Sequence, residues 1–198
     1  MREVLLAKSA GFCYGVRRAV ELAEEMARAG LPCVMLGSII HNRDVVDRLA
    51  EQGLHAVERP EQVPDGGAVI IRSHGESRAV HEQLRSRGVR ILDATCPNVT
   101  RIHQIVARAE ERGRQPVIVG TPDHPEVLAI AGWCRAPAVV SGAQELEKWL
   151  SECPERRDFP LTFVSQTTST KKIWDECVKK AKKECTNAEF FDTICGAT

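Results

Sequence analysis

The sequence predicts an α/β fold with mostly parallel sheets, and three observations support that prediction. Short apolar runs alternate along the chain with longer amphipathic stretches. Glycine follows three of the amphipathic stretches directly, as expected at helix C-termini (Gly30, Gly88, Gly113). Polar and sulfur-bearing residues follow the apolar runs, which is where open α/β sheets bind their ligands. Strands that alternate with helices in this way usually pair in parallel and are covered by the helices.

The predicted strands are short runs dominated by apolar and β-branched side chains. In chain order they are Val4–Ala7, Cys33–Leu36, Ala68–Ile71, Val89–Leu92, Pro116–Val119, Ala138–Val140, Leu161–Val164 and Glu189–Phe191. The predicted helices have apolar residues at helical spacing. They are Val16–Ala29, Arg43–Glu51, Arg78–Arg87, Asn98–Arg112, Pro125–Ala131, Ala143–Leu150 and Thr170–Cys185. The stretch Ser151–Pro160 is rich in proline and charge and is predicted to be a loop.

Composition favours a soluble globular protein whose function lies in a local site. The chain has 198 residues, and 27 Lys and Arg are balanced by 27 Asp and Glu. A net charge of zero provides no long-range attraction to nucleic acid or to anionic lipid, so we expect neither as a partner. The apolar run near the N-terminus is interrupted by Lys8 and followed by Arg17 and Arg18. It predicts neither a secretory leader nor a membrane span, and we expect a cytoplasmic protein.

Eight cysteines are a high number for a cytosolic protein of this length. A disulfide framework is not expected in the cytosol, and no CxxC spacing indicates a zinc finger or a thioredoxin-like motif. Five cysteines lie in apolar runs or lack a turn context, so we expect no role for them (Cys33, Cys134, Cys153, Cys177, Cys185). Cys13, Cys96 and Cys195 differ because they lie in turns between a strand and a helix, where a thiolate is favoured.

Two of these turns resemble each other. DATC at Asp93–Cys96 and DTIC at Asp192–Cys195 are both Asp-x-x-Cys tetrads placed directly after a predicted strand. A match of four residues is weak evidence alone. It suggests that one sheet-plus-helix unit is used more than once, with a cysteine at the same position in each.

Further candidate site residues also follow predicted strands. They are His41, His74, His124, Glu126 and Thr167. Imidazoles beside helix N-termini, with threonines nearby, suit a phosphate or a diphosphate. Each histidine has the ordinary alternative of capping a helix or forming a polar loop contact. Glu126 is either a solvated acid in the first turn of a helix or a proton donor beside a histidine.

The three turn cysteines are far apart in the sequence, so they must converge in space if they bind a metal. Three thiolates suit an iron–sulfur cluster, which normally takes four protein ligands and would keep one iron for a substrate oxygen. Zinc held by three cysteines is the alternative, although zinc has no redox chemistry.

Seven motifs, in order along the whole chain, resemble the 4-hydroxy-3-methylbut-2-enyl diphosphate reductase (IspH/LytB) family. They are AGFCYGVRRAV, GSIIHNRDVVDRL, RSHG, LDATCP, HPEV, VSQTTS and DTICGAT. The resemblance implies a two-electron reductive dehydroxylation that gives isopentenyl and dimethylallyl diphosphate, the last step of the non-mevalonate isoprenoid pathway. It also implies a [4Fe-4S] cluster held by Cys13, Cys96 and Cys195 whose unique iron binds the hydroxyl oxygen of the substrate.

The resemblance assigns roles to the other candidates as well. His41 and His74 would contact the diphosphate, and His124 and Thr167 would join the hydrogen-bond network around the substrate. Glu126 would deliver the proton that lets the hydroxyl leave as water. Reduced ferredoxin or flavodoxin would supply the electrons.

The family fold has three α/β units, each with a sheet between helices, around a pseudo-threefold axis. On this basis we expect a first unit at residues 14–96, a second at 97–191, and remnants of a third at 1–13 and 192–198. Val4–Ala7 and Glu189–Phe191 would then lack sheet partners, and a Ser-Ser-Asn run and a later serine that complete the diphosphate site would be missing. We therefore expect weak or no activity from these 198 residues alone. The alternative function is a non-catalytic cluster-binding or interaction module.

Overall fold

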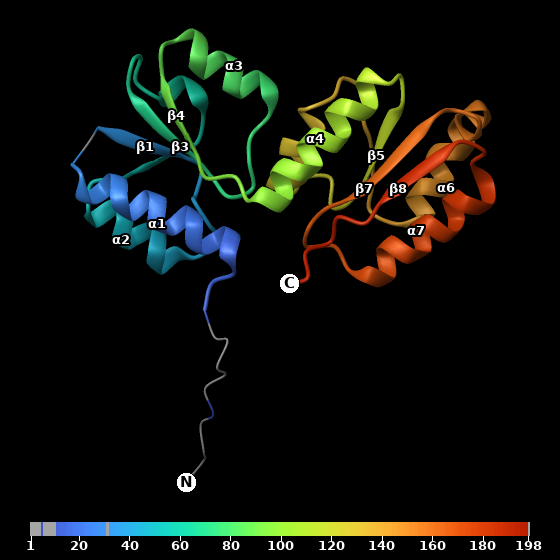
Figure 1. Ribbon diagram of the computed structural model, residues 1–198, viewed down its shortest axis with the longest axis horizontal. Coiled ribbons are helices and arrows are strands. Elements are labelled where there is room, and N and C mark those ends of the chain that lie inside the picture. The colour runs from blue at the N-terminus through green and yellow to red at the C-terminus, as the bar shows by residue number, and fades with distance from the viewer. Residues whose placement is uncertain (1–4, 6–10, 31, 198) are drawn as a thin grey trace.

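The computed structural model describes residue 5, residues 11–30 and residues 32–197. The predicted strand Val4–Ala7 lies outside the described residues except for Leu5, which is exposed. Figure 1 shows two α/β units side by side, with the C-terminal end of the chain between them. Every strand pairing in the described residues is parallel, which confirms the predicted fold class. None of the helices in this part of the chain is long and apolar enough to cross a membrane.

The first unit has a four-stranded sheet in the order β2-β1-β3-β4. Its strands are β1 (Cys33–Leu36), β2 (Ala56–Val57), β3 (Ala68–Ile71) and β4 (Arg90–Asp93). Helices α1 (Tyr14–Arg28) and α2 (Arg43–Glu51) cover one face, where Ala23 and Leu49 pack with Met35 of β1. Helix α3 (Arg78–Ser86) covers the other face, where Leu84 packs with Ile71. A 3-10 turn, Pro60–Gln62, lies between β2 and β3.

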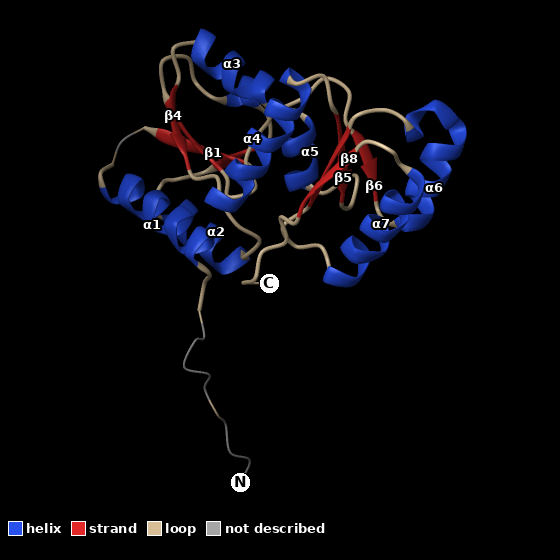
Figure 2. Cartoon of the chain, turned by 45° about the vertical axis from the view of Figure 1, so that its right-hand side comes forward, coloured by secondary structure: helices blue, strands red, loops and turns tan. Residues whose placement is uncertain are grey.

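The second unit repeats this plan with the order β6-β5-β7-β8. Its strands are β5 (Gln115–Val119), β6 (Ala138–Val140), β7 (Leu161–Ser165) and β8 (Ala188–Phe191). Figure 2 shows its sheet between two helix pairs, α4 (Pro97–Glu111) with α5 (Pro125–Ala131) and α6 (Ala143–Glu152) with α7 (Lys171–Glu184). Ile102 and Ile130 pack on one face of the sheet, and Leu146 and Trp174 pack on the other.

Local sequence explains where several helices begin and end. Asn42, Ser77 and Thr170 accept a hydrogen bond from a backbone N–H of the first turn of α2, α3 and α7. The predicted glycine C-caps are confirmed at α1, α3 and α4, because Gly30 has a φ of +62° and Gly88 and Gly113 each have a φ of +69°.

The structure corrects three details of the sequence prediction. β2 is not predicted because two residues are too short to show a periodicity. The predicted loop Ser151–Pro160 contains the last residues of α6 and a 3-10 turn, Pro154–Arg157. Third, Glu189–Phe191 does not lack a sheet partner, because β8 pairs with β7 and Phe190 stacks on Phe163 with ring centroids 5.1 Å apart.

Candidate functional site

The strand order sets where the candidate residues meet. In each sheet the second strand along the chain pairs on one side of the first strand, and the third strand pairs on its other side. The first and third strands, β1 and β3 or β5 and β7, are therefore neighbours. The loops after those two adjacent strands therefore diverge, which leaves a crevice at the carboxyl ends of the strands. In the first unit these loops carry His41 and His74, and in the second they carry His124 and Thr167.

The three histidines lie together and form what we call the histidine cluster (His41, His74, His124). The ring centroids of His41 and His74 are 4.6 Å apart, and those of His74 and His124 are 5.7 Å apart. The cluster therefore joins the two units, since His41 and His74 come from the first and His124 from the second.

Two of these histidines, His74 and His124, have a lowered pKa. Burial, with the nearby imidazoles of His41 and His124, lowers the pKa of His74 to about 4. Burial also lowers the pKa of His124. His124 caps helix α5, and its Nδ1 accepts a hydrogen bond from the backbone N–H of Glu126 at 3.1 Å. A neutral His124 must then carry its proton on Nε2, so that nitrogen is the donor available to a ligand.

Glu126 lies in the first turn of α5 and is 2% exposed. The backbone N–H of Thr167 donates to its Oε1 at 2.6 Å, and the Thr167 hydroxyl lies 2.6 Å from its Oε2. Both oxygens are thus held by one residue of the loop after β7. Two hydrogen bonds fix the carboxyl group, and such fixed positioning is what a general acid needs.

Each of the three turn cysteines is placed by a turn or a helix end. Cys13 is the N-cap residue of α1 and Cys96 that of α4. Cys195 follows β8, and its backbone N–H donates to the carbonyl of Thr167 at 2.8 Å. Both Asp-x-x-Cys tetrads form the same local turn, because each aspartate accepts a bond from the N–H two residues on, at Thr95 and Ile194. The suggested repeat is therefore present in the backbone as well as in the sequence.

These residues line one pocket of about 130 Å³. Its walls include all three turn cysteines, His74, Glu126 and Thr167, together with Ser73, Asn98 and Val99. Within the described residues, no three His, Cys, Asp or Glu side chains are close enough together to hold a single metal ion. We call this space the cysteine pocket.

Two residues that contact the pocket cysteines were not predicted. Asn98 Nδ2 donates to Cys195 Sγ at 3.3 Å, so an amide of α4 supports a cysteine of the second unit. Gly15 of α1 lies so close to Cys96 that a Cβ there would be 2.5 Å from Cys96 Sγ. Nothing in a hydrophobic pattern marks either residue, although both lie two residues after a turn cysteine.

The remaining cysteines lie away from this pocket. Burial raises the pKa of Cys33 and Cys177 to about 11 and that of Cys134 to about 12. Burial raises the pKa of Cys185 too. These thiols stay protonated at neutral pH, as is typical of cysteines that serve as small apolar side chains.

Comparison with known proteins places the chain among related sequences and structures. The family model described as LytB protein matches residues 4–198. A Caldanaerobacter subterraneus protein named 4-hydroxy-3-methylbut-2-enyl diphosphate reductase is 39% identical over 204 residues, which are 99% of this chain and 68% of that protein. A Clostridium acetobutylicum protein of the same name is also 39% identical, and the match covers all of this chain but only 30% of that protein.

Solved structures agree with the sequence comparison. A Plasmodium falciparum E-1-hydroxy-2-methyl-but-2-enyl-4-diphosphate reductase superposes with a TM-score of 0.88 at 28% identity, over 96% of this chain and 60% of that chain. A second structure, described as (E)-4-hydroxy-3-methyl-but-2-enyl diphosphate reductase, the terminal enzyme of the non-mevalonate pathway, has a TM-score of 0.82 at 34% identity. The superposition covers all of this chain and 69% of that chain. The matched family model, the relatives and the shared fold show that the chain belongs to the LytB family.

Proposed function

We propose that this chain carries out the reductive dehydroxylation of 4-hydroxy-3-methylbut-2-enyl diphosphate to isopentenyl and dimethylallyl diphosphate. The observation that carries the proposal is the cysteine pocket, where three cysteines face a buried carboxyl group and a histidine of the adjoining cluster. Relatives named as this reductase support it. The overall change adds two electrons and two protons to the substrate and releases water.

The donor set of the pocket fits a [4Fe-4S] cluster held by Cys13, Cys96 and Cys195. Cys13 and Cys96 are the N-cap residues of α1 and α4, and Asn98 donates to the sulfur of Cys195. Three cysteines leave one of the usual four positions to an outside ligand. A bound cluster would supply electrons to the substrate and a Lewis-acidic iron for its hydroxyl group.

The histidine cluster is suited to the diphosphate. His41, His74 and His124 come from three loops and converge beside the pocket. Neutral imidazoles each donate one hydrogen bond, and a diphosphate beside them would favour the protonated, doubly donating form.

Glu126 is the proposed proton donor. Hydroxide is a poor leaving group, so protonation of the substrate hydroxyl oxygen by the Glu126 carboxyl group lowers the barrier to its departure as water. Thr167 holds the carboxyl in place through its N–H and its hydroxyl, beside the pocket that both residues line. The electrons would come from reduced ferredoxin or flavodoxin in the cytoplasm, where thiols stay reduced.

The test is anaerobic reconstitution of the chain with iron and sulfide, followed by a dithionite-driven assay on the diphosphate substrate. We expect a brown protein and slow formation of the two products, identified by mass spectrometry. A colourless protein loaded with zinc would contradict the cluster. A stable cluster without any product would contradict the activity and favour the alternative, a cluster-binding module.

A further inference from the structure

His74 lies in the loop of residues 72–77, between β3 and α3, and the first half of this loop is held by its own unit. The backbone N–H of Ser73 donates to the carbonyl of Ile39 at 3.2 Å. The carbonyl of Ser73 accepts from the N–H of Cys96 at 2.9 Å. These bonds fix the chain directly before His74, between the loop after β1 and a cysteine of the pocket.

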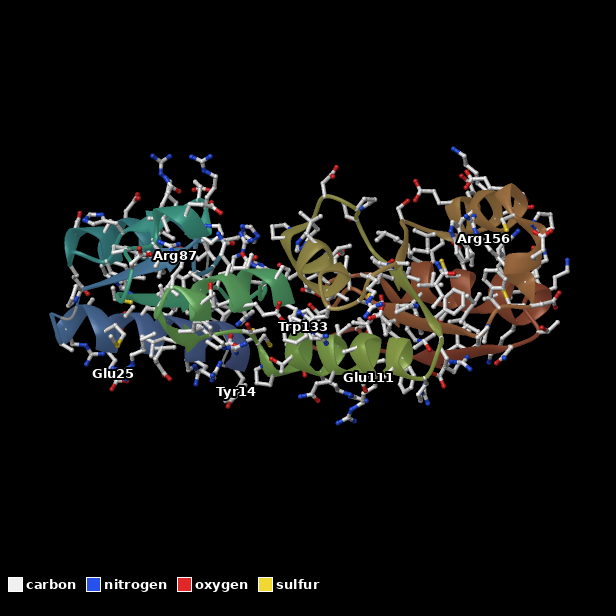
Figure 3. All side chains as sticks on the ribbon, turned by 90° about the horizontal axis from the view of Figure 1, so that it is seen from above. Tyr14, Glu25, Arg87, Glu111, Trp133 and Arg156 are labelled. Atoms are coloured by element: carbon white, nitrogen blue, oxygen red, sulfur yellow. The ribbon has the colours of Figure 1, made fainter. Side chains whose placement is uncertain are left out.

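The second half of the loop is held by the other unit. Trp133, just after α5, donates from its Nε1 to the carbonyl of Glu76 at 3.0 Å. Beside it, the N–H of Arg78 donates to the carbonyl of Gly132 at 3.2 Å. Figure 3 shows Trp133 in the middle of the molecule, where the two units meet. The loop is therefore hydrogen-bonded to the first unit before His74 and to the second unit after it.

Packing at this junction leaves the loop little freedom. A Cβ on Gly75 would lie 2.7 Å from Cε1 of His103, and Gly75 has a φ of +79°. The indole of Trp133 stacks on the buried ring of His103, with centroids 5.0 Å apart and planes 16° apart. The guanidinium of Arg78 also packs on Trp133, 5.3 Å from the centroid of its indole ring. These contacts hold the indole ring of Trp133 in place beside the loop.

We propose that Trp133 is a positioning residue for His74, holding the loop of residues 72–77 so that the His74 ring stays against His41 and His124. Trp133 acts through the Glu76 carbonyl and does not itself touch the histidine cluster in this arrangement. The expected effect on diphosphate affinity rests on the proposed function, in which the histidine cluster binds the diphosphate.

The test compares Trp133→Phe with Trp149→Phe. Phenylalanine at position 133 keeps an aromatic ring beside His103 but loses the N–H that binds Glu76. Trp149 is a matched control, because it is half-buried, has Arg156 over its ring at 4.7 Å and lies in α6. Two properties are measured on the folded chain: the nuclear Overhauser effect between the ring protons of His41 and His74, and the Kd for inorganic diphosphate by calorimetry.

We expect the Overhauser effect to weaken in Trp133→Phe alone and the Kd to rise about fivefold, the equivalent of one lost hydrogen bond. An unchanged Overhauser effect in Trp133→Phe would overturn the inference. If unmodified protein fails to bind diphosphate while the Overhauser effect still weakens in Trp133→Phe, the diphosphate contact of the proposed function fails and the positioning role stands. An equal weakening of the Overhauser effect in Trp133→Phe and Trp149→Phe would indicate a general loss of stability and would also overturn the inference.

Discussion

At the scale of single residues, Glu126 is the side chain whose surroundings are most specialised. It is 2% exposed, yet both of its carboxyl oxygens bond to the loop that carries Thr167. Its own N–H fixes the tautomer of His124. One residue therefore connects a hydrogen-bond donor of the histidine cluster to the cysteine pocket.

Replacing Glu126 by Gln tests this role. Glutamine can accept from the Thr167 N–H and donate to its hydroxyl, so the fold and the cluster absorbance should persist. Product formation should fall by about 10²–10⁴, the usual contribution of a general acid. The control is Glu58→Gln, at an exposed position of the first unit. Unchanged turnover in the Glu126 variant would remove its role as proton donor.

Cysteine replacements separate ligands from ordinary thiols. Cys96→Ser should abolish the visible absorbance after anaerobic reconstitution, because a hydroxyl is a poor ligand for iron in such clusters. Cys153→Ser, at a cysteine outside the pocket whose thiol lies 3.2 Å from Oε2 of nearby Glu155, should keep the full absorbance. Retention of the absorbance in the Cys96 variant would show that this cysteine is not a ligand.

At the scale of elements, the approach of α1 to α4 matters most for the cysteine pocket. Gly15 lies in the first turn of α1 and is buried against Cys96, the N-cap residue of α4. Helix propensity favours alanine over glycine by about 1 kcal/mol, so propensity and packing make opposite predictions for Gly15→Ala. A Cβ 2.5 Å from Cys96 Sγ must push the sulfur aside.

We expect packing to win, and Gly15→Ala to lower the amount of cluster bound per chain in an iron and sulfide assay. Gly142→Ala is the matched control, because no atom lies within 4 Å of a Cβ at that helix N-cap. A Gly15 variant that binds a full cluster would show that the two helices can separate at no cost to the cysteines.

Most elements were predictable because each buries an apolar face against a helix or a sheet. β1, β3 and β6 begin and end where the apolar runs do. β2 exists only because β1 offers it a free edge, which is a tertiary cause. The candidate site residues were predictable from their places after strands. Asn98 acts through a contact with a cysteine far along the chain and Trp133 through a contact with the other unit, and no local pattern encodes either contact.

At the scale of the whole molecule, the junction between the units makes stability depend on pH. Burial lowers the pKa of His103 to about 4, and among the described residues its Nε2 has no hydrogen-bond partner. Between the ordinary value of 6.5 and about 4, the unfolded chain binds a proton that the folded chain does not. The free energy of unfolding should therefore fall as the pH falls, by up to about 1.4 kcal/mol per pH unit for this histidine.

Urea unfolding at a series of pH values between 7 and 4 measures this dependence. His103→Gln should reduce the slope of unfolding free energy against pH, since no histidine remains there to take up the proton. His55→Gln should leave the slope unchanged because His55 is exposed. Equal slopes in all three proteins would show that His103 does not resist protonation in the folded state.

The shared strand order of the two units has one more consequence. The turns of Cys96 and Cys195 follow the last strand of each sheet, whereas His41, His74, His124, Glu126 and Thr167 follow the two central strands of each sheet. Selection can therefore remodel the central loops to accept a different molecule while the turns that hold these two cysteines stay intact. Such a layout lets the ligand preference of the central loops evolve independently of the two cysteines.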